Sequence, residues 1–235
     1  MSKNVVIIPA RAGSKGVKKK NFRSFGGKPL IQWSIDVAKM TKEVDEIIVT
    51  TDDDDIMGLC DSIGCRYIKR PENLASDTAS TLDVLRHAVE QLEFTPSYVI
   101  LIQPTTPFRT PEQLSKAISS FQKSGFDSLM SISPVPKHYS PVWQKSLGEN
   151  NRVLSIDGTV IHDDTNATRK QDLPITYWKN GSIYITKTDV LMGVGLFGNS
   201  TYGFVIDDEF QVNIDTEFDF FLGEAILDYK RRLSD

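Results

Sequence analysis

The sequence predicts an α/β fold in which a mostly parallel sheet carries helices on both faces. Apolar runs of strand length alternate with longer segments whose apolar residues recur at helical spacing. The runs at residues 5–9 and 98–103 are apolar enough to be buried on both faces, as strands of a parallel sheet are. Alternation of this kind builds parallel sheets with right-handed crossovers. A chain of 235 residues is long enough for one large domain with one excursion.

The first half of the chain supplies most of the expected sheet. We expect strands at residues 5–9, 46–50, 66–68 and 98–103, and helices between them at 29–39, 54–62 and 82–92. Pro29 suits the first turn of a helix, where its missing N–H is not needed. The acidic run 52–55 follows a strand and precedes a helix, so we interpret it as a solvated helix cap rather than a metal site.

The second half begins with a clear helix start. Thr110 offers a capping hydroxyl, Pro111 takes the first position and Gln113 the third, which predicts a helix to about residue 123. A strand at 128–135 follows, and then regularity stops over 136–176, a stretch with three prolines and a Gly148–Asn151 turn. So long an irregular segment in a compact domain is typical of a functional or interface element. Strands at 182–186 and 204–207 and a helix at 216–233 complete the chain.

Composition excludes several classes of protein. The net charge of −4 gives no reason to expect nucleic-acid binding by the whole surface. No run of 18 apolar residues exists, and the N-terminal apolar run is too short for a signal peptide, so we expect a cytoplasmic protein without membrane contact. Cys60 and Cys65 are too few for a disulfide framework and have no neighbouring His or Cys for zinc, which predicts reduced structural thiols.

One segment concentrates positive charge. Between Arg11 and Lys28 lie seven basic residues and no acidic one. The glycine-containing loop 10–16 follows the first strand, at the edge of an α/β sheet where ligands bind. Its backbone N–H groups and cations could hold phosphate. The spacing matches neither a Walker A loop nor G-x-G-x-x-G, and a solvated basic loop is the alternative.

Five blocks in order carry a resemblance to a known family. They are residues 8–16 with Lys20-Asn21, residues 70–78, residues 103–110, residues 180–185 and residues 213–217. Across nearly the whole chain they resemble the acylneuraminate cytidylyltransferases, the CMP-sialic acid synthetases. The resemblance implies a Rossmann-like nucleotidyltransferase domain over residues 1–235, with 136–176 as an inserted element for dimerisation and substrate capping.

The resemblance also implies roles for individual residues. The expected catalytic residues are Arg11, Lys15, Lys20 and Asp215. The expected nucleotide-binding residues are Ala10, Arg11, Gly13, Ser14, Lys15, Asn21, Arg70, Asp77 and Thr81. The expected sugar-binding residues are Gln103, Thr105, Arg169, Asn180 and Tyr184, and the expected Mg²⁺ ligands are Asp215 and Asn213. Without the family, Tyr184 would be interpreted as core packing.

By the same resemblance, the chain would be a homodimer that transfers CMP from CTP to the anomeric hydroxyl of a nonulosonic acid such as N-acetylneuraminic acid. Three positions depart from the pattern. Asn213 stands where the family often has Asp, and Trp143 and Trp178 stand where some members carry Lys and Arg near the sugar. Legionaminic acid, an 8-amino keto sugar acid and a Kdo-like acid are therefore alternative acceptors. A non-catalytic nucleotide-binding protein is a further alternative.

Overall fold

A seven-stranded sheet forms the centre of the computed structural model, which describes residues 3–13, 16–161, 169–208 and 210–234. Its order is β11 (Thr201–Val205), β7 (Ser128–Pro134), β10 (Tyr177–Lys187), β6 (Tyr98–Leu101), β1 (Asn4–Pro9), β4 (Glu46–Thr51) and β5 (Arg66–Lys69). Strand β10 runs antiparallel to both of its neighbours, and every other pair is parallel. The expected mostly parallel α/β sheet is confirmed.

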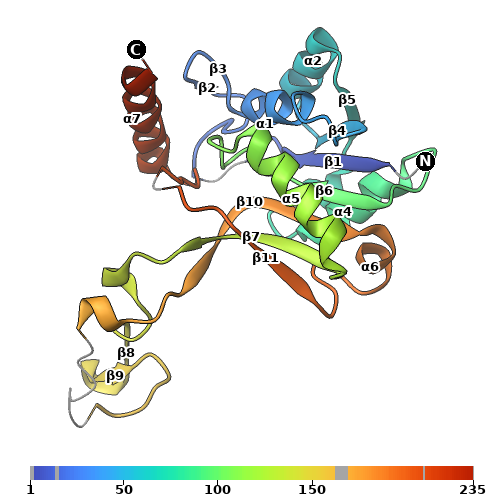
Figure 1. The fold of residues 1–235 in the computed structure, drawn as a ribbon. Coiled ribbons are helices and arrows are strands. Elements are labelled where there is room, and N and C mark those ends of the chain that lie inside the picture. Colours follow the sequence, from blue (N-terminus) through green and yellow to red (C-terminus); the bar gives the residue numbers. More distant parts are fainter. Residues whose placement is uncertain (1–2, 14–15, 162–168, 209, 235) are drawn as a thin grey trace.

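Helices cover both faces of this sheet (Figure 1). On one face α1 (Leu30–Lys39), α2 (Asp54–Ile63) and α5 (Pro111–Ser124) pack over Val6 and Ile8 of β1. On the other face α4 (Thr81–Glu90) and α6 (Thr188–Gly193) pack over Val5 and Ile7. These four apolar side chains of β1 are fully buried, so the apolar run at the start of the chain does correspond to a strand buried on both faces.

Capping residues set the helix ends as the sequence predicts. The Thr110 hydroxyl accepts the Gln113 N–H at 3.2 Å, and the Gln113 carboxamide oxygen accepts the Thr110 N–H at 3.0 Å. This reciprocal pair satisfies two donors that a helix start leaves unpaired. At the other end Gly125 adopts φ 74°, a left-handed conformation that glycine takes without steric penalty.

A segment of residues 135–176 projects away from the sheet, and the paired ends of β7 and β10 form its stem (Figure 1). It holds the short hairpin of β8 (Lys145–Leu147) and β9 (Val153–Ser155), together with the 3₁₀ turns η1 (Lys137–Tyr139), η2 (Glu149–Asn151) and η3 (Lys170–Asp172). The sequence-based expectation of an irregular stretch holds here, with only short elements inside it.

Several boundaries differ from the predicted ones. Strand β10 begins at Tyr177 rather than 182, because its first three side chains are exposed and leave no apolar pattern to find. The last strand spans Thr201–Val205 rather than 204–207, and its side chains alternate between exposed and half-buried. The hairpin of β2 (Ser24–Phe25) and β3 (Lys28–Pro29), the short helix α3 (Glu72–Ala75) and α6 were not predicted.

The last helix, α7 (Glu217–Ser234), packs on a small separate core. Phe220 of α7 meets Phe25 edge to face with 5.6 Å between ring centroids, and Leu227 lies in the same cluster. This contact joins the end of the chain to the segment that follows β1. None of the described helices is long and apolar enough to cross a membrane.

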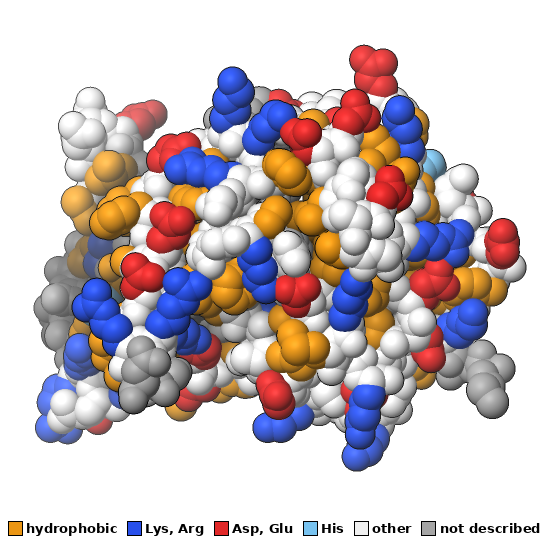
Figure 2. Space-filling view, turned by 90° about the horizontal axis from the view of Figure 1, so that it is seen from above, with side chains coloured by type: hydrophobic (Ala, Val, Ile, Leu, Met, Phe, Trp, Pro, Cys, Tyr) orange, Lys and Arg blue, Asp and Glu red, His pale blue; other side chains and the backbone are white. Residues whose placement is uncertain are grey.

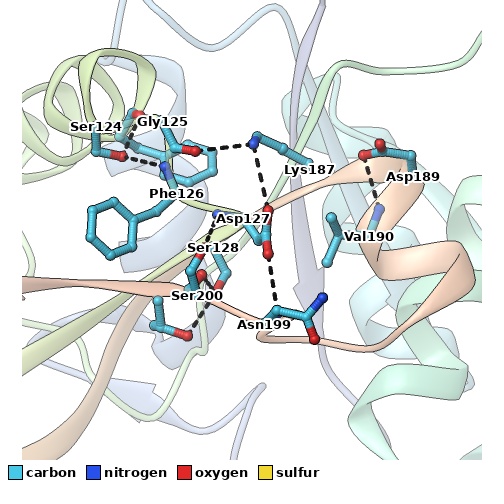
Figure 3. A network of polar contacts seen from close by, with 12 residues as sticks. Ser124, Gly125, Phe126, Asp127, Ser128, Lys187, Asp189, Val190, Asn199 and Ser200 are labelled. Carbon is cyan, nitrogen blue, oxygen red and sulfur yellow. Dashed lines mark hydrogen bonds and ion pairs between the residues drawn. The ribbon is translucent and has the colours of Figure 1, made fainter.

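A network of hydrogen bonds and one ion pair stabilises the chain segments that meet at the amino end of β7 (Figure 3). The Asp127 carboxylate accepts the backbone N–H of Asn199 at 3.1 Å and lies 3.6 Å from the Lys187 ammonium. The Asp127 N–H donates to the Ser200 carbonyl, and Lys187 also donates to the carbonyl of Gly125. The network thus joins the end of α5, the end of β10 and the turn before β11, at the edge opposite the carboxyl ends of the parallel strands.

Candidate functional site

A cleft of about 480 Å³ opens at the carboxyl ends of β1, β5 and β6. Loops far apart in the sequence line it, as the open α/β architecture dictates. Among its described lining residues are Arg11, Lys20, Asn21, Arg70, Asp77, Thr81, Gln103, Thr105, Asn213 and Asp215. All ten were expected in the site from the sequence. The structure therefore brings together residues from all but one of the five sequence blocks in this cleft.

The loop after β1 is held by contacts at both ends. The Ala10 N–H donates to the Thr50 carbonyl at 3.0 Å, and the buried Asn21 amide donates to the Arg11 carbonyl at 3.2 Å. The Arg11 guanidinium pairs with Asp77 at 2.7 Å and donates to the Ser76 carbonyl at 2.9 Å. These contacts fix the course of the basic loop above the cleft.

Asp52 also holds this loop, which the sequence did not indicate. Its carboxylate accepts the N–H of Ala12 at 2.9 Å. The helix-cap interpretation of the acidic run holds for its other members, because Asp53 caps α2 by accepting the Asp55 N–H at 2.9 Å. Asp52 thus has a separate role from its neighbours in this run.

The buried Arg70 guanidinium forms the wall next to this loop. It donates to the Thr50 carbonyl at 2.8 Å. Burial lowers the pKa of Arg70 to about 10, the nearby Asp52 carboxylate acts in the opposite direction, and Arg11 lowers it further. Arg70 therefore keeps its positive charge at neutral pH and presents it to the cleft.

The basic loop and the segment 213–215 approach each other closely. A Cβ added to Gly16 would come 1.9 Å from the Asp215 carbonyl oxygen, so this approach requires a glycine at position 16. The Lys20 ammonium donates to the Ile214 carbonyl at 2.7 Å and to the Asp215 carboxylate at 2.9 Å. Asn213 donates its amide to the other Asp215 oxygen at 2.8 Å.

The oxygen atoms of Asn213 and Asp215 suit a magnesium ion only if the substrate supplies further ligands to the same ion. The described residues contain no group of three or more His, Cys, Asp or Glu side chains that could enclose a metal. Mg²⁺ commonly takes one or two protein carboxylates and completes its shell with phosphate and water. The Asp215 carboxylate, 62% exposed, and the Asn213 carboxamide oxygen match that chemistry.

A second cavity of about 240 Å³ adjoins the first, since Thr81, Gln103 and Asn213 line both. Its other described lining residues are Leu101, Lys179, Asn180, Gly181, Tyr184, Leu196 and Phe197. Three of the expected sugar-binding residues, Gln103, Asn180 and Tyr184, therefore face this smaller cavity. The walls combine amide groups with the apolar side chains of Leu101, Leu196 and Phe197.

The buried Asn180 shapes this cavity through β10 and β7. Its carboxamide oxygen accepts from the Ser131 hydroxyl at 2.6 Å and from the Ser182 N–H at 3.1 Å. Its amide donates to the Ser133 hydroxyl at 2.9 Å, which leaves one amide hydrogen for a ligand. Tyr184 lies beside it with a pKa raised by burial, so its hydroxyl stays protonated at neutral pH.

Comparison with known proteins identifies the family. A model of the family described as Cytidylyltransferase matches residues 5–219. The chain belongs to the cytidylyltransferase family. The resemblance to acylneuraminate cytidylyltransferases is thereby confirmed, because curated members of that kind match over nearly the full chain.

Two relatives illustrate the range of this family. The N-acylneuraminate cytidylyltransferase of Streptococcus agalactiae serotype V is 31% identical over 98% of this chain and 55% of its own length, so the chain spans about half of that relative. The CMP-N,N'-diacetyllegionaminic acid synthase of Campylobacter jejuni is 33% identical over 98% of this chain and 97% of its own length.

Among solved structures, CMP:2-keto-3-deoxy-manno-octonic acid synthetase complexed with CTP shares the fold. Its TM-score is 0.71 at 20% identity, over 97% of this chain and 100% of that one.

Some expected site residues of this cytidylyltransferase lie elsewhere. Arg169 lines neither cavity: its side chain is 76% exposed and pairs with Asp172 at 2.9 Å. Ala10 is buried at the end of β1, and a Cβ on Gly13 would meet open space. Ser14 and Lys15 lie outside the described residues.

The two tryptophans that differ from the family pattern also lie outside both cavities. Trp143 and Trp178 belong to the projecting segment and its stem, and each is 38% exposed. Neither is among the described residues that line the two cavities. Instead, the neighbouring Lys179 lines the smaller cavity, which sequence reasoning missed although it directly precedes a recognised block.

Surface charge agrees with a small anionic ligand. Lys and Arg side chains are interspersed with Asp and Glu over the face shown in Figure 2, and no broad basic area covers it. The cations that matter for the site are gathered inside the cleft, where Arg11, Lys20 and Arg70 all contribute to its lining. An electrostatic site of this kind suits a polyphosphate group better than a long polyanion.

Proposed function

We propose that this protein transfers CMP from CTP to the anomeric hydroxyl of a nonulosonic acid such as N-acetylneuraminic acid, with release of pyrophosphate. One observation carries the proposal: a cleft with three cationic side chains adjoins a smaller amide-lined cavity, and the two share Thr81, Gln103 and Asn213. Two substrates could therefore meet at that shared wall. The relatives whose names state CMP-sugar synthesis support the same conclusion.

In this mechanism the chain acts mainly by positioning and charge neutralisation. Arg11, Lys20 and the expected Lys15 bind the triphosphate, and Arg70 binds the nucleotide from the wall beside this loop. Lys20, which now pairs with Asp215 at 2.9 Å, would turn toward phosphate when CTP enters. The acceptor hydroxyl attacks the α-phosphorus and pyrophosphate leaves, so no covalent bond to the enzyme forms.

Asp215 and Asn213 would hold Mg²⁺ together with the phosphates. The metal, when bound, supplies further neutralisation of phosphate charge. Because Asn213 contributes a neutral oxygen where the family often has a carboxylate, Asp215 provides the negative charge of this pair. Asn213 still lines both cavities, so its carboxamide could contact either substrate.

Legionaminic acid is a second candidate for the natural acceptor, with an 8-amino keto sugar acid or a Kdo-like acid as further variants. The 33% identity to a CMP-N,N'-diacetyllegionaminic acid synthase favours this candidate, whereas Trp143 and Trp178, which lie outside both cavities, do not bear on the choice of acceptor. A non-catalytic nucleotide-binding protein has only Asn213 in its favour.

We also propose a cytoplasmic homodimer. The projecting segment exposes large apolar side chains, among them Leu147 and Ile175 at 71% each and Tyr139 at 63%. A second copy could cover these side chains and bring its own segment toward the cleft.

The decisive experiment measures pyrophosphate release from CTP and Mg²⁺ with a panel of 2-keto acid sugars, with products identified by mass. Release with N-acetylneuraminic acid supports the main proposal, and release only with a relative selects the second candidate. Binding of CTP with no release on any acid would favour the non-catalytic alternative. Omission of Mg²⁺ from the same assay tests whether the reaction depends on the metal.

A further inference from the structure

Strand β10 loses its regular alternation where it meets the smaller cavity. Its register against β7 shifts between Lys179 and Tyr184, and Gly181 takes φ 76° within the shift. In a regular strand, neighbouring side chains point to opposite faces. Here Lys179, Asn180 and Gly181 all line the same cavity, because an irregularity of this type re-aims side chains.

Lys179 is the one charged side chain among the described residues that line the smaller cavity. No hydrogen bond or ion pair within the described chain engages its ammonium group. The cations of the larger cleft are already engaged, since Arg11 pairs with Asp77 and Lys20 with Asp215. Lys179 is exposed, so it brings an uncompensated positive charge to the open side of a cavity whose other described lining residues are neutral, which suits a ligand with a single negative charge.

A 2-keto acid sugar has its carboxylate on the carbon that bears the reacting hydroxyl. A cation that binds the carboxylate therefore also places the nucleophile. We propose that Lys179 binds the carboxylate of the acceptor in the smaller cavity, an inference that rests on the proposed function. Gln103 and Asn213, which line both cavities, then lie between this carboxylate and the nucleotide. Lys179 would thus select acidic acceptors over neutral sugars.

The test compares wild type with Lys179→Met and Lys179→Arg, using the best acid of the acceptor panel and its methyl ester. Loss of a charge-assisted hydrogen bond should raise the KM for the acid about 10- to 100-fold in Lys179→Met. The KM for CTP should stay within about twofold, because the triphosphate lies in the other cleft. Lys179→Arg should restore most of the affinity for the acid. The methyl ester should react equally poorly with wild type and Lys179→Met.

Lys116→Met is the matched control, since it removes one exposed lysine from α5, which lines neither cavity. It should leave both KM values unchanged. A KM for the acid that is unchanged in Lys179→Met, or a defect confined to CTP, would overturn the assignment while wild-type turnover upheld the proposed function. Failure of wild type to react with any acid would overturn both, and calorimetric titration of the acid into the CMP-saturated enzyme provides a readout apart from turnover.

Discussion

Arg109 shows how a single residue can organise the site without touching the cleft. Its guanidinium is buried, and burial lowers its pKa to about 9. It donates to the Ser182 carbonyl at 2.8 Å, the Gln103 carbonyl at 3.1 Å and the Thr106 hydroxyl at 2.7 Å. These acceptors belong to the two chain segments that shape the smaller cavity. Arg109 is therefore a positioning residue that ties the 103–106 loop to β10.

We expect Arg109→Met to destabilise the fold by about 2–4 kcal/mol, because several buried acceptors lose their donor, while relief of a buried charge offsets part of the loss. Denaturant unfolding measures this change. The KM for the acceptor should rise more than the KM for CTP, since Gln103 loses its anchor. Arg66→Met is the control: it breaks an exposed pair with Glu46 at 2.6 Å and should change stability by about 1 kcal/mol or less. Equal effects from the two variants would contradict the role of Arg109.

Asp215 is expected to act in the reaction rather than in stability. Because its side chain is 62% exposed and it provides the one carboxylate of the 213–215 motif, Asp215→Ala should lower kcat by about 100-fold or more at fixed Mg²⁺. The midpoint of unfolding should change little. Steady-state kinetics over a Mg²⁺ series and a thermal melt measure the two effects. Glu217→Ala, which removes an exposed carboxylate paired with Arg23, should keep normal turnover. Near-normal turnover of Asp215→Ala would remove it as a metal ligand.

At the scale of elements, local signals explain what the sequence predicts and what it misses. Helix α5 is predictable because its start depends on Thr110, Pro111 and Gln113 alone. The first part of β10 is missed because Tyr177–Lys179 pairs with β7 outside the core, where no apolar alternation is needed.

The same reasoning applies to the candidate site. The family resemblance identifies most of its residues, and the fold brings several of them together because the carboxyl ends of parallel strands meet at one edge. Asp52 is missed since a run of four acids does not show which member turns to the loop, and Lys179 is missed since a bulge directs it. Arg169 lies away from both cavities in a single chain.

The Asp127 network makes a pH-dependent prediction for the sheet edge. The N–H of Asn199 holds the pKa of Asp127 below its usual value, against the opposing effect of burial, and Ser200 and Lys187 lower it further. The unfolded chain therefore binds more protons than the folded chain just below about pH 4, so this contribution to stability is present above the unfolded pKa and is lost as the pH falls through the folded pKa. Asp127→Asn should lower the unfolding midpoint at neutral pH, and the difference from wild type should shrink toward zero in acid.

Urea unfolding at about pH 7, 4 and 3 measures this difference. Lys187→Met is the matched variant, because it removes the ion pair at 3.6 Å but keeps the backbone donors to the carboxylate. It should retain most of the pH dependence of wild type. A gap between Asp127→Asn and wild type that stays constant from neutral to acid pH would show that the carboxylate charge contributes nothing here.

At the scale of the whole molecule, the projecting segment departs most from a compact monomer. It stands away from the sheet on the stem of β7 and β10 (Figure 1). Several of its large apolar side chains, among them Leu147 and Ile175, are exposed. Single exposed apolar residues are ordinary on monomers, but several of them in one projecting element are typical of an interface. The cleft lies at the carboxyl ends of the parallel strands of the same sheet. A partner bound to the projecting segment would therefore also lie near the cleft.

We therefore expect the wild-type chain of 26.4 kDa to have twice that mass in solution, and Leu147→Asp combined with Ile175→Asp to return it to a monomer. Two charges placed in an apolar contact should weaken association about 100-fold or more. Sedimentation velocity at micromolar concentration measures the mass. Met40→Asp, which alters an apolar side chain 65% exposed at the end of α1, should leave it unchanged. A monomeric wild type, or a double variant that remains a dimer, would contradict this interface.

If the partner's segment also caps the cleft, the monomer should lose acceptor affinity while it still binds CTP, because the triphosphate contacts come from loops of one chain.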